Sequence, residues 1–354
     1  MLSHHLEFEQ QLRDVYEPQH GWKGPDDFLF VSVPHEKGVK LQEGAWAPSA
    51  CCVEAKCTHV VPKERTVVPK MVSWDVLERV HPKKYLDMLQ TSRKELYDIF
   101  EQEVEEASLT EGDKRFVLDP LRHCVGATML ATALAYVYGS VVSTEGSMHH
   151  ASTEMGEGSG VFADVPLAWI TLREHLMEMG VHNPQAMYLD VDVHHCNGTA
   201  YARDELGIQD HFHLVDLYNK DIWPVQHDQE SLQHLTVAKG FPSGTGSRRF
   251  LELLREALAE AEQIKPDILF YCAYNDTLKG DPLGECNVTA KGIHQRDRMV
   301  IQWARERNIP ICIFYGGGYG SDACQVARDT LVKLNDEFGV WEPPTTPTKR
   351  MKLL

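Results

Sequence analysis

Five short apolar runs alternate with amphipathic segments from residue 140 onward, and this alternation leaves few possible folds for the chain. The runs cover residues 140–144, 186–193, 212–218, 268–274 and 309–315. Amphipathic helices are predicted at about 165–179, 248–263, 290–307 and 322–336. Short apolar runs separated by helices are typical of parallel strands that are buried on both faces. We therefore predict one doubly wound α/β domain, with helices on both faces of a mostly parallel central sheet.

The remaining segments carry weaker patterns. Residues 1–70 have no clear periodicity, and we expect an irregular N-terminal portion that is packed on the core or precedes it. Helices are predicted at 74–80, 83–106 and 121–138. The α/β domain is expected to cover residues 71–340, followed by a disordered tail at 341–354.

Cysteine usage and the start of the chain indicate an intracellular protein. The nine cysteines are odd in number and several lie in apolar runs, which is typical of reduced thiols in the cytosol or nucleus. The polar, acidic start is unlike a secretory signal, and no apolar run of about 18 residues predicts a membrane span. The basic stretch at 349–352 is a candidate nuclear import signal. We expect a nuclear or cytoplasmic protein that is not secreted.

The balance of charges bears on the kind of partner. The formal net charge is −17. Such a charge disfavours direct binding to nucleic acid and suits a basic partner, such as a lysine-rich protein. The same charge is equally well explained by solubility alone, so it carries little weight in identifying a partner.

Polar side chains with chemical capacity follow four of the five apolar runs. His149 and His150 follow the first run, Asp276 the fourth and Tyr319 the fifth, while Asp192 and His194 lie at the end of the second. In open α/β sheets, ligands bind beyond the carboxyl ends of the strands. These side chains are therefore predicted to converge on one site.

The second run predicts a metal centre. Asp190, Asp192 and His194 alternate with two valines, and alternate side chains of a strand share one face. Three ionisable groups on a buried face are costly unless a cation neutralises them. With Asp276 from another strand, Asp192 and His194 form a three-ligand set that leaves a position open for catalysis. Zn²⁺ is favoured, Fe²⁺ would suit the same ligands, and Asp190 is better placed behind them.

A less specific interpretation of the same residues is that the carboxylates cap strand ends and His194 is a hydrogen-bonded core histidine. For an isolated Asp-x-His pattern that interpretation would be preferred. The addition of Asp276 and of the histidine pair favours the metal centre.

The adjacent histidines His149 and His150 precede a loop of small residues. Hydrolysis of an amide requires a base for the attacking water and an acid for the leaving amine. Two histidines whose pKa values differ can divide those tasks. Asp190 is predicted to orient one ring and Asn197 the other, although a neutral asparagine raises the basicity of its partner less than an aspartate would.

Tyr319 follows three consecutive glycines. A glycine-rich turn can bind phosphate, but this one lacks both the G-x-G-x-x-G spacing and the lysine of a P-loop. A turn that presents the tyrosine hydroxyl to a developing oxyanion is the favoured interpretation. The remaining alternative is a tyrosine that only packs against its neighbours.

The residues described so far resemble the active-site motifs of the histone deacetylase family, which has the arginase/deacetylase fold. The motifs are GSMHHA at 146–151, DVDVHHCNGT at 190–199, DTLKGDPLG at 276–284 and GGGY at 316–319. A further landmark is VH at 80–81 with YL at 85–86, and DLYNKDIWP at 216–224 is similar to the class IV version. The resemblance covers about residues 70–340 and is specific, because four separated motifs agree in order and spacing.

The resemblance implies a zinc-dependent hydrolase that removes acyl groups from lysine side chains of a protein or peptide. The implied metal ligands are Asp192, His194 and Asp276. Asp190 would also help to hold a structural K⁺ ion. His149 and His150 would be the tandem catalytic histidines, with His150 favoured as the general base.

Further residues carry roles by the same resemblance. Tyr319 would polarise the acyl carbonyl. The tunnel for the acyl-lysine would be lined by Ser159, Gly160, Trp223, Leu283, Gly317 and Gly318.

Three positions depart from the family pattern. Ser147 and Cys196 replace glycines next to the histidines, and Ser159 replaces the tunnel phenylalanine. Trp223 is expected to keep an aromatic side chain on the opposite wall. Loss of one aromatic predicts a wider tunnel, and we expect longer acyl chains to be accepted, as the class IV resemblance also suggests.

Two other functions remain open. The first is an acetylpolyamine amidohydrolase on the same fold. Such enzymes place an acidic residue near the tunnel mouth, where this chain has the apolar Leu283, so a lysine in a polypeptide is favoured. The second is a catalytically weak acyl-lysine-binding or scaffold protein. The three departures support that reading, whereas the presence of every residue that the chemistry needs opposes it.

Overall fold

A single parallel sheet forms the centre of the protein, and the computed structural model describes residues 29–31 and 66–338. The strands are β1 (Leu29–Val31), β2 (Thr66–Val67), β3 (Ser140–Ser143), β4 (Ala186–Asp190), β5 (Phe212–Asn219), β6 (Val237–Phe241), β7 (Ile268–Cys272) and β8 (Ile311–Phe314). Their order in the sheet is β2-β1-β3-β8-β7-β4-β5-β6, and every neighbouring pair is parallel. The prediction of a doubly wound α/β domain is confirmed.

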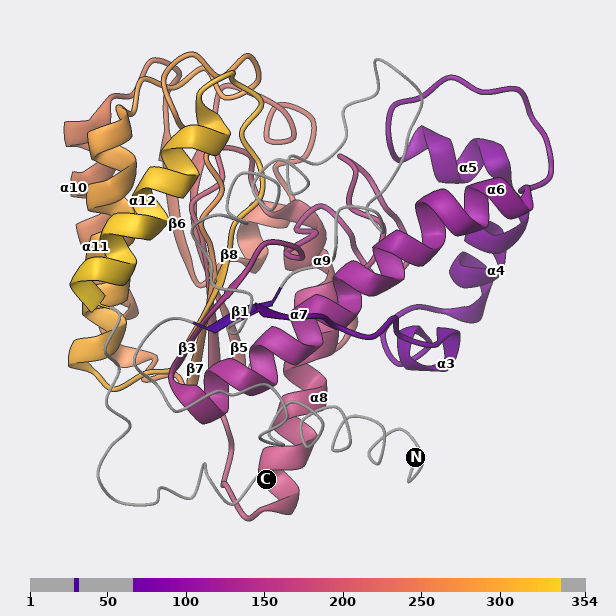
Figure 1. Cartoon of the computed structure of the whole chain (residues 1–354), viewed down its shortest axis with the longest axis horizontal. Coiled ribbons are helices and arrows are strands. Elements are labelled where there is room, and N and C mark those ends of the chain that lie inside the picture. The colour runs from indigo at the N-terminus through magenta and orange to yellow at the C-terminus, as the bar shows by residue number, and fades with distance from the viewer. Residues whose placement is uncertain (1–28, 32–65, 339–354) are drawn as a thin grey trace.

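Helices cover both faces of this sheet (Figure 1). The α-helices of the described residues are α3 (Trp74–Leu77), α4 (Lys83–Thr91), α5 (Arg93–Asp98), α6 (Glu111–Asp113), α7 (Asp119–Tyr138), α8 (Asp164–Glu178), α9 (Asn197–Glu205), α10 (Ser247–Glu260), α11 (Ala290–Glu306) and α12 (Ala323–Phe338). Helices α7 to α9 pack on one face of the sheet and α10 to α12 on the other, whereas α3 to α6 lie to one side of it. None of the helices in the described part of the chain combines the length and hydrophobicity that a membrane span requires.

Alternating residues of the central strands explain the two layers. Met187 and Leu189 of β4 belong to one hydrophobic cluster, which they share with α10, α11 and α12. Ala186 and Tyr188 belong to a second cluster, shared with α7, α8 and α9. Successive side chains of a strand point to opposite faces, so a strand buried on both faces must be apolar throughout. The continuous apolar run at this position predicts such a strand.

A third hydrophobic cluster lies beside the sheet. It joins α3, α4, α5 and α7 to Val161, Phe162 and Leu167. The segment that follows the histidine pair is therefore anchored by helices far away in sequence. Burial of these apolar side chains is the main source of stability that holds that segment in place.

Several predicted boundaries are wrong. The helix predicted at 83–106 is two helices, because Ser92 is extended and its hydroxyl accepts a hydrogen bond from the Glu95 amide as an N-cap of α5. The strand predicted at 186–193 ends at Asp190. The N-terminal portion, expected to be irregular, contributes β1 and β2 to the sheet. Strand β6 and helix α9 were not predicted, and the tail predicted to be disordered lies outside the described residues.

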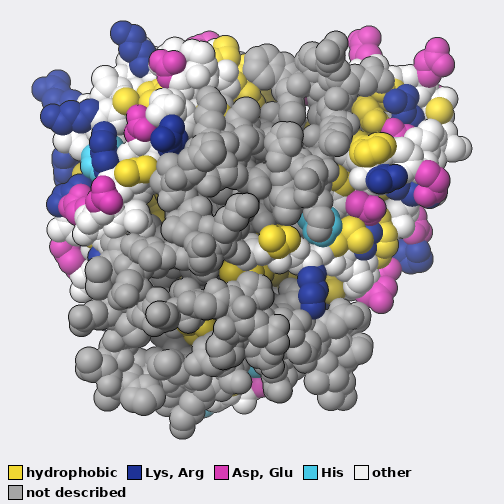
Figure 2. Space-filling view, in the orientation of Figure 1, with side chains coloured by type: hydrophobic (Ala, Val, Ile, Leu, Met, Phe, Trp, Pro, Cys, Tyr) yellow, Lys and Arg dark blue, Asp and Glu magenta, His cyan; other side chains and the backbone are white. Residues whose placement is uncertain are grey.

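On the face seen in Figure 2, acidic and basic side chains occur together at both lateral margins of the described surface. Mixed margins of this kind do not form the continuous basic area that would attract nucleic acid. The expectation that the chain does not bind nucleic acid directly stays a prediction.

The buried His81 predicts a pH dependence of stability. Its Nδ1 donates to the Thr153 carbonyl at 2.7 Å, and its Nε2 accepts from the Ala163 amide at 3.0 Å, so the ring is held neutral. Burial lowers the pKa of His81 to about 4, against the opposing effect of the bond to Thr153. Relative to the ordinary value, this corresponds to about 3 kcal/mol.

That stability is fully present above pH 6.5 and is lost progressively as the pH falls toward about 4, because only the unfolded chain binds the proton in this range. We expect His81→Gln to be less stable at pH 7 but to lose less of its free energy of unfolding between pH 7 and pH 4.5. Denaturant titrations of both proteins at the two pH values measure this. Equal losses in the two proteins would contradict the assignment.

Candidate active site and metal centre

The sheet order brings the ends of four strands side by side. Strands β3, β8, β7 and β4 are consecutive neighbours, and all point the same way. The histidine pair follows β3, Asp192 and His194 follow β4, Asp276 follows β7, and Tyr319 follows β8. The predicted convergence of these residues at one end of the sheet is confirmed.

Asp192, His194 and Asp276 meet at this end with donor atoms that all lie within 4.8 Å of one another. His194 Nδ1 is 2.9 Å from Asp192 Oδ1 and 3.2 Å from Asp276 Oδ2. Asp276 is fully buried, and its Oδ1 accepts from the Val193 amide at 2.9 Å. The backbone therefore holds this carboxylate in position.

The electrostatics of this group favour a cation. Burial, together with the negative charge of Asp276, raises the pKa of Asp192 to about 8. Burial opposes a charge on His194, but its bonds to Asp192 and Asp276 outweigh it and raise the pKa of that ring to about 10. Two buried carboxylates that share one imidazole carry an excess of negative potential. One nitrogen and two carboxylate donors around that potential fit a divalent cation such as Zn²⁺ or Fe²⁺.

Asp190 does not share a strand face with Asp192 and His194, so that prediction is wrong. The strand ends at Asp190, and Asp192 and His194 lie in a bend. Asp190 Oδ2 instead lies 2.8 Å from His149 Nδ1 and accepts from the Tyr188 hydroxyl at 2.8 Å. Its Oδ1 accepts from the Asp192 amide at 2.9 Å.

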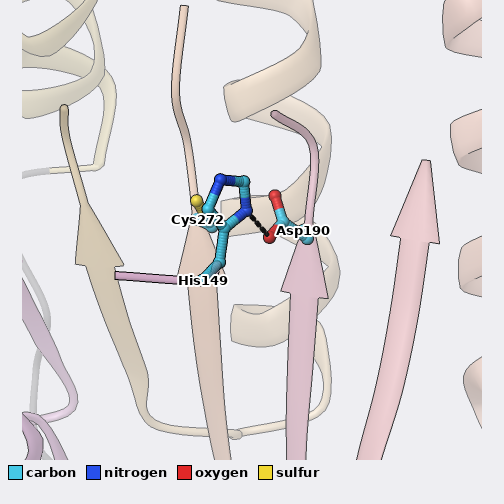
Figure 3. Close-up of side chains that lie close together, drawn as sticks. All are labelled: His149, Asp190 and Cys272. Carbon is cyan, nitrogen blue, oxygen red and sulfur yellow. Dashed lines mark hydrogen bonds and ion pairs between the residues drawn. The ribbon is translucent and has the colours of Figure 1, made fainter. Parts of the chain in front are cut away.

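The two adjacent histidines have separate partners. Figure 3 shows the imidazole of His149 directed at the carboxylate of Asp190, with Cys272 on the neighbouring strand. His150 Nδ1 lies 2.7 Å from Asn197 Oδ1, and the two imidazole centroids are 4.0 Å apart. Both orienting contacts expected from the sequence are present.

These environments separate the two pKa values. Burial disfavours a charge on His149, but the charges of Asp190 and Asp192 outweigh it and raise the pKa of the ring to about 9. Burial and the positive charges of His149 and His194 hold the pKa of His150 well below its usual range. His149 therefore tends to be charged and His150 neutral, which suits a division into electrostatic and proton-accepting tasks.

Close packing holds the histidine pair. A Cβ at Gly146 would lie 2.0 Å from Thr128 Oγ1, and a Cβ at Gly198 would lie 2.1 Å from the His150 carbonyl carbon. Ser147, where the family resemblance implies a glycine, has a φ of +65°. Its amide donates to Asp164 Oδ2 at 2.7 Å, and its hydroxyl contacts the Tyr188 hydroxyl at 2.8 Å. These contacts compensate for the left-handed backbone that a serine rarely adopts.

Two further groups of potential ligands occur among the described residues. They are His149 with Asp190 and Cys272, and His195 with Cys196 and Asp216. Burial and nearby carboxylates raise the pKa of both thiols well above the usual value, so neither cysteine is a ready thiolate ligand. The Cys196 thiol is fully buried and lies 3.2 Å from Asp216 Oδ2, away from the catalytic cavity.

Asp281 positions the glycine-rich turn that carries Tyr319. Its Oδ2 accepts from the Tyr319 amide at 2.6 Å, and its Oδ1 accepts from the Leu283 amide at 2.9 Å. Burial and the charges of Asp192 and Asp276 raise the pKa of the Tyr319 hydroxyl, so the phenol stays protonated and can donate a hydrogen bond. Phosphate binding by this turn has no support in these contacts.

A cavity of about 480 Å³ opens onto the histidines and onto Asp192, His194 and Tyr319. Five of the six predicted tunnel residues line it, namely Ser159, Gly160, Trp223, Leu283 and Gly317. The prediction for Gly318 is wrong, because this glycine packs against Ala323 and Asn275 instead. The volume is typical of small-molecule sites.

Several lining residues escaped the sequence analysis, including Phe100, Glu101, Met148, Tyr274 and Glu285. Tyr274 had a usable signal, since it precedes Asp276 by two residues at the same strand end. Its hydroxyl donates to the Gly146 carbonyl at 2.6 Å. Phe100 had none, because only tertiary packing brings the segment that follows α5 to the cavity.

Comparison with known proteins places these features in context. Residues 49–334 match the histone deacetylase domain. The chain is similar to histone deacetylase 2 of Arabidopsis thaliana, with 33% identity over 220 residues, which covers 62% of this chain and 54% of that protein. It is also similar to histone deacetylase 8 of Xenopus tropicalis, with 24% identity over 72% of this chain and 68% of that protein. The chain thus spans about half the length of its Arabidopsis relative.

Solved structures share the fold at low identity. The HDA15 HD domain superimposes with a TM-score of 0.70 and 15% identity, covering 92% of this chain and 93% of that one. The acetylpolyamine aminohydrolase of Burkholderia pseudomallei gives a TM-score of 0.64 and 18% identity, covering 85% and 97%. Both similarities establish the architecture of the sheet and its helices.

Proposed function

The chain belongs to the histone deacetylase family, and from that premise we propose that it hydrolyses acyl-lysine amides in proteins or peptides. The observation that carries the proposal is the cavity that opens onto two histidines with separate partners, a protonated tyrosine and the cluster of Asp192, His194 and Asp276. The closer similarity to class IV members stays a prediction.

We propose that Asp192, His194 and Asp276 hold one Zn²⁺ ion, with Fe²⁺ as the alternative. When bound, such an ion supplies Lewis acidity for the acyl carbonyl and for the attacking water. The K⁺ ion implied by the family resemblance also remains a prediction.

His150 is the proposed general base. Asn197 engages its Nδ1, so Nε2 is the nitrogen left to take a proton from the attacking water. That proton is then available for the lysine nitrogen as the amide bond breaks, which yields a free lysine amine and a carboxylate. The charged His149, held by Asp190, stabilises negative charge that develops nearby.

Tyr319 is proposed to donate a hydrogen bond to the acyl oxygen as it becomes negative. Its raised pKa keeps the proton on the phenol for this purpose. The backbone bonds from Tyr319 and Gly320 to Asp281 hold the turn in place, so the ring needs little reorganisation.

The acyl-chain preference provides the test of substrate class. Ser159 lines the cavity where the family pattern has phenylalanine, and we expect myristoyl-lysine peptides to be hydrolysed at least as efficiently as acetyl-lysine peptides. Ser159→Phe should then lower the ratio of kcat/KM for the myristoyl peptide to kcat/KM for the acetyl peptide by about 10-fold or more. The reason is that each methylene excluded from the cavity loses about 0.8 kcal/mol of burial free energy. Kinetics on a chain-length panel measure this, with Ser159→Ala as the matched control. Much faster turnover of acetyl than of myristoyl peptides would contradict the proposal.

An acetylpolyamine is the second candidate substrate, and one observation favours it. Leu283 is apolar, but Glu101 and Glu285 line the same cavity and offer negative charge to a cationic substrate. A direct comparison of acetylspermidine with an acetyl-lysine peptide decides between them. Zinc-loaded protein that hydrolyses neither substrate would instead support a scaffold or an acyl-lysine-binding protein.

A further inference from the structure

One hydrogen-bond chain leads from the candidate base away from the cavity. His150 Nδ1 meets Asn197 Oδ1 at 2.7 Å, and Asn197 Nδ2 donates to Glu157 Oε1. Glu157 lines a neighbouring cavity of about 580 Å³. It does not line the catalytic cavity, onto which Asp192 and His194 open. Among the residues that the structure describes, no lysine or arginine lines that neighbouring cavity.

We propose that Glu157 is a positioning residue that fixes the orientation of the Asn197 amide and, through it, the tautomer of His150. The proposal rests on the hydrolase function proposed above. Nothing in the family resemblance assigns a role to this position.

The orientation of the Asn197 amide depends on which of its atoms can donate a hydrogen bond. The two ends of an asparagine amide have nearly the same shape, but only the nitrogen carries hydrogens. An ionised carboxylate can only accept, so Glu157 requires the NH₂ end of Asn197 to face it. The oxygen then faces His150 and can only accept, which places the proton of the ring on Nδ1 and leaves a lone pair on Nε2.

A reversed amide would have the opposite consequence. The NH₂ group would face Nδ1 of His150, which would have to accept, and the ring proton would move to Nε2. That tautomer has no lone pair toward the cavity and cannot act as the base. An aspartate at position 197 would need no such control, because both of its oxygens accept.

The backbone holds Glu157 firmly against this pair. The Gly160 amide donates to the Glu157 carbonyl at 2.8 Å, and Gly158 and Ser159 between them have φ values of +52° and +67°, as in a tight β-turn. A Cβ at Gly158 would lie 2.7 Å from the His150 ring. The Ser159 amide donates to the Ile99 carbonyl at 2.9 Å. One turn thus directs Ser159 into the catalytic cavity and Glu157 onto Asn197.

A double-mutant cycle tests the proposal. Glu157→Ala in the zinc-loaded full chain should lower kcat about 10-fold with little change in KM, as loss of an outer partner typically does. Glu157→Gln keeps an acceptor oxygen and should recover part of that loss. In an Asn197→Asp background, Glu157→Ala should cause no loss. Glu154→Gln removes a carboxylate from the same cavity without touching Asn197, and it should leave kcat unchanged.

A second measurement does not depend on activity. Histidine ¹⁵N shifts, assigned with His150→Ala, should show the Nδ1–H tautomer of His150 in the wild type and a mixture in Glu157→Ala. An Nε2–H tautomer in the wild type, or equal losses of kcat in both position-197 backgrounds, would overturn the proposal. A wild type without hydrolase activity would remove the proposed function, while the NMR measurement would still decide the role of Glu157.

Discussion

Asp276→Ala should abolish stoichiometric zinc binding and hydrolysis together. Asp276 supplies one of three donors that lie within 4.8 Å of one another, and it is fully buried. Loss of even an outer partner of a metal site costs about 10–100-fold in affinity or activity, so loss of a ligand should exceed about 100-fold in both. Metal analysis of the purified protein and kcat/KM on an acyl-lysine peptide measure the two effects.

The metal-free variant should still fold, because Asp276 and Asp192 repel each other when no cation lies between them. Zinc at 100 times its Kd should stabilise the folded wild type by about 2.7 kcal/mol and so raise its Tm. The Tm of the variant should not change. Asp267→Ala is the matched control. Asp267 lies just before the amino end of β7, and its carboxylate accepts from the Gln185 amide at 2.9 Å, at the end of the sheet opposite to the candidate site. Full zinc content in Asp276→Ala would refute the ligand set.

Tyr319→Phe should lower kcat by about 10²–10³-fold and change KM little. The hydroxyl is proposed to bond the acyl oxygen mainly as negative charge develops, and one donor of this kind typically contributes that factor. The variant keeps the backbone bond to Asp281, so the turn should stay in place. Steady-state kinetics with equal zinc content measure the effect.

Tyr218→Phe provides the control for Tyr319→Phe. Tyr218 lies on β5, and its side chain does not line the catalytic cavity, so kcat should stay close to the wild-type value. A kcat of Tyr319→Phe within about 2-fold of wild type would instead assign the tyrosine a packing role.

The sheet architecture and the candidate ligand set were predictable from the apolar runs of the sequence and from the polar residues at their ends. Apolar runs such as that at β7 predict buried strands, because every side chain of a strand that is covered on both faces is buried and therefore apolar. Polar residues at the ends of such runs must gather at one edge of a parallel sheet, which is why Asp192, His194 and Asp276 were found together. Family resemblance added the roles that are proposed for the histidines and for Tyr319.

Tertiary structure decided what local pattern does not contain. Strand β6 carries only two buried residues, Val237 and Phe241, so its assignment depends on pairing with β5 rather than on an apolar run. Phe100 reaches the cavity, and Glu157 reaches Asn197, through contacts between segments far apart in the chain. Such contacts arise from packing of many side chains at once, and no periodicity in the sequence records them. The fold and the meeting of Asp192, His194 and Asp276 were therefore predictable from the residues alone, whereas the shape of the cavity and the partners behind His150 depended on the folded chain.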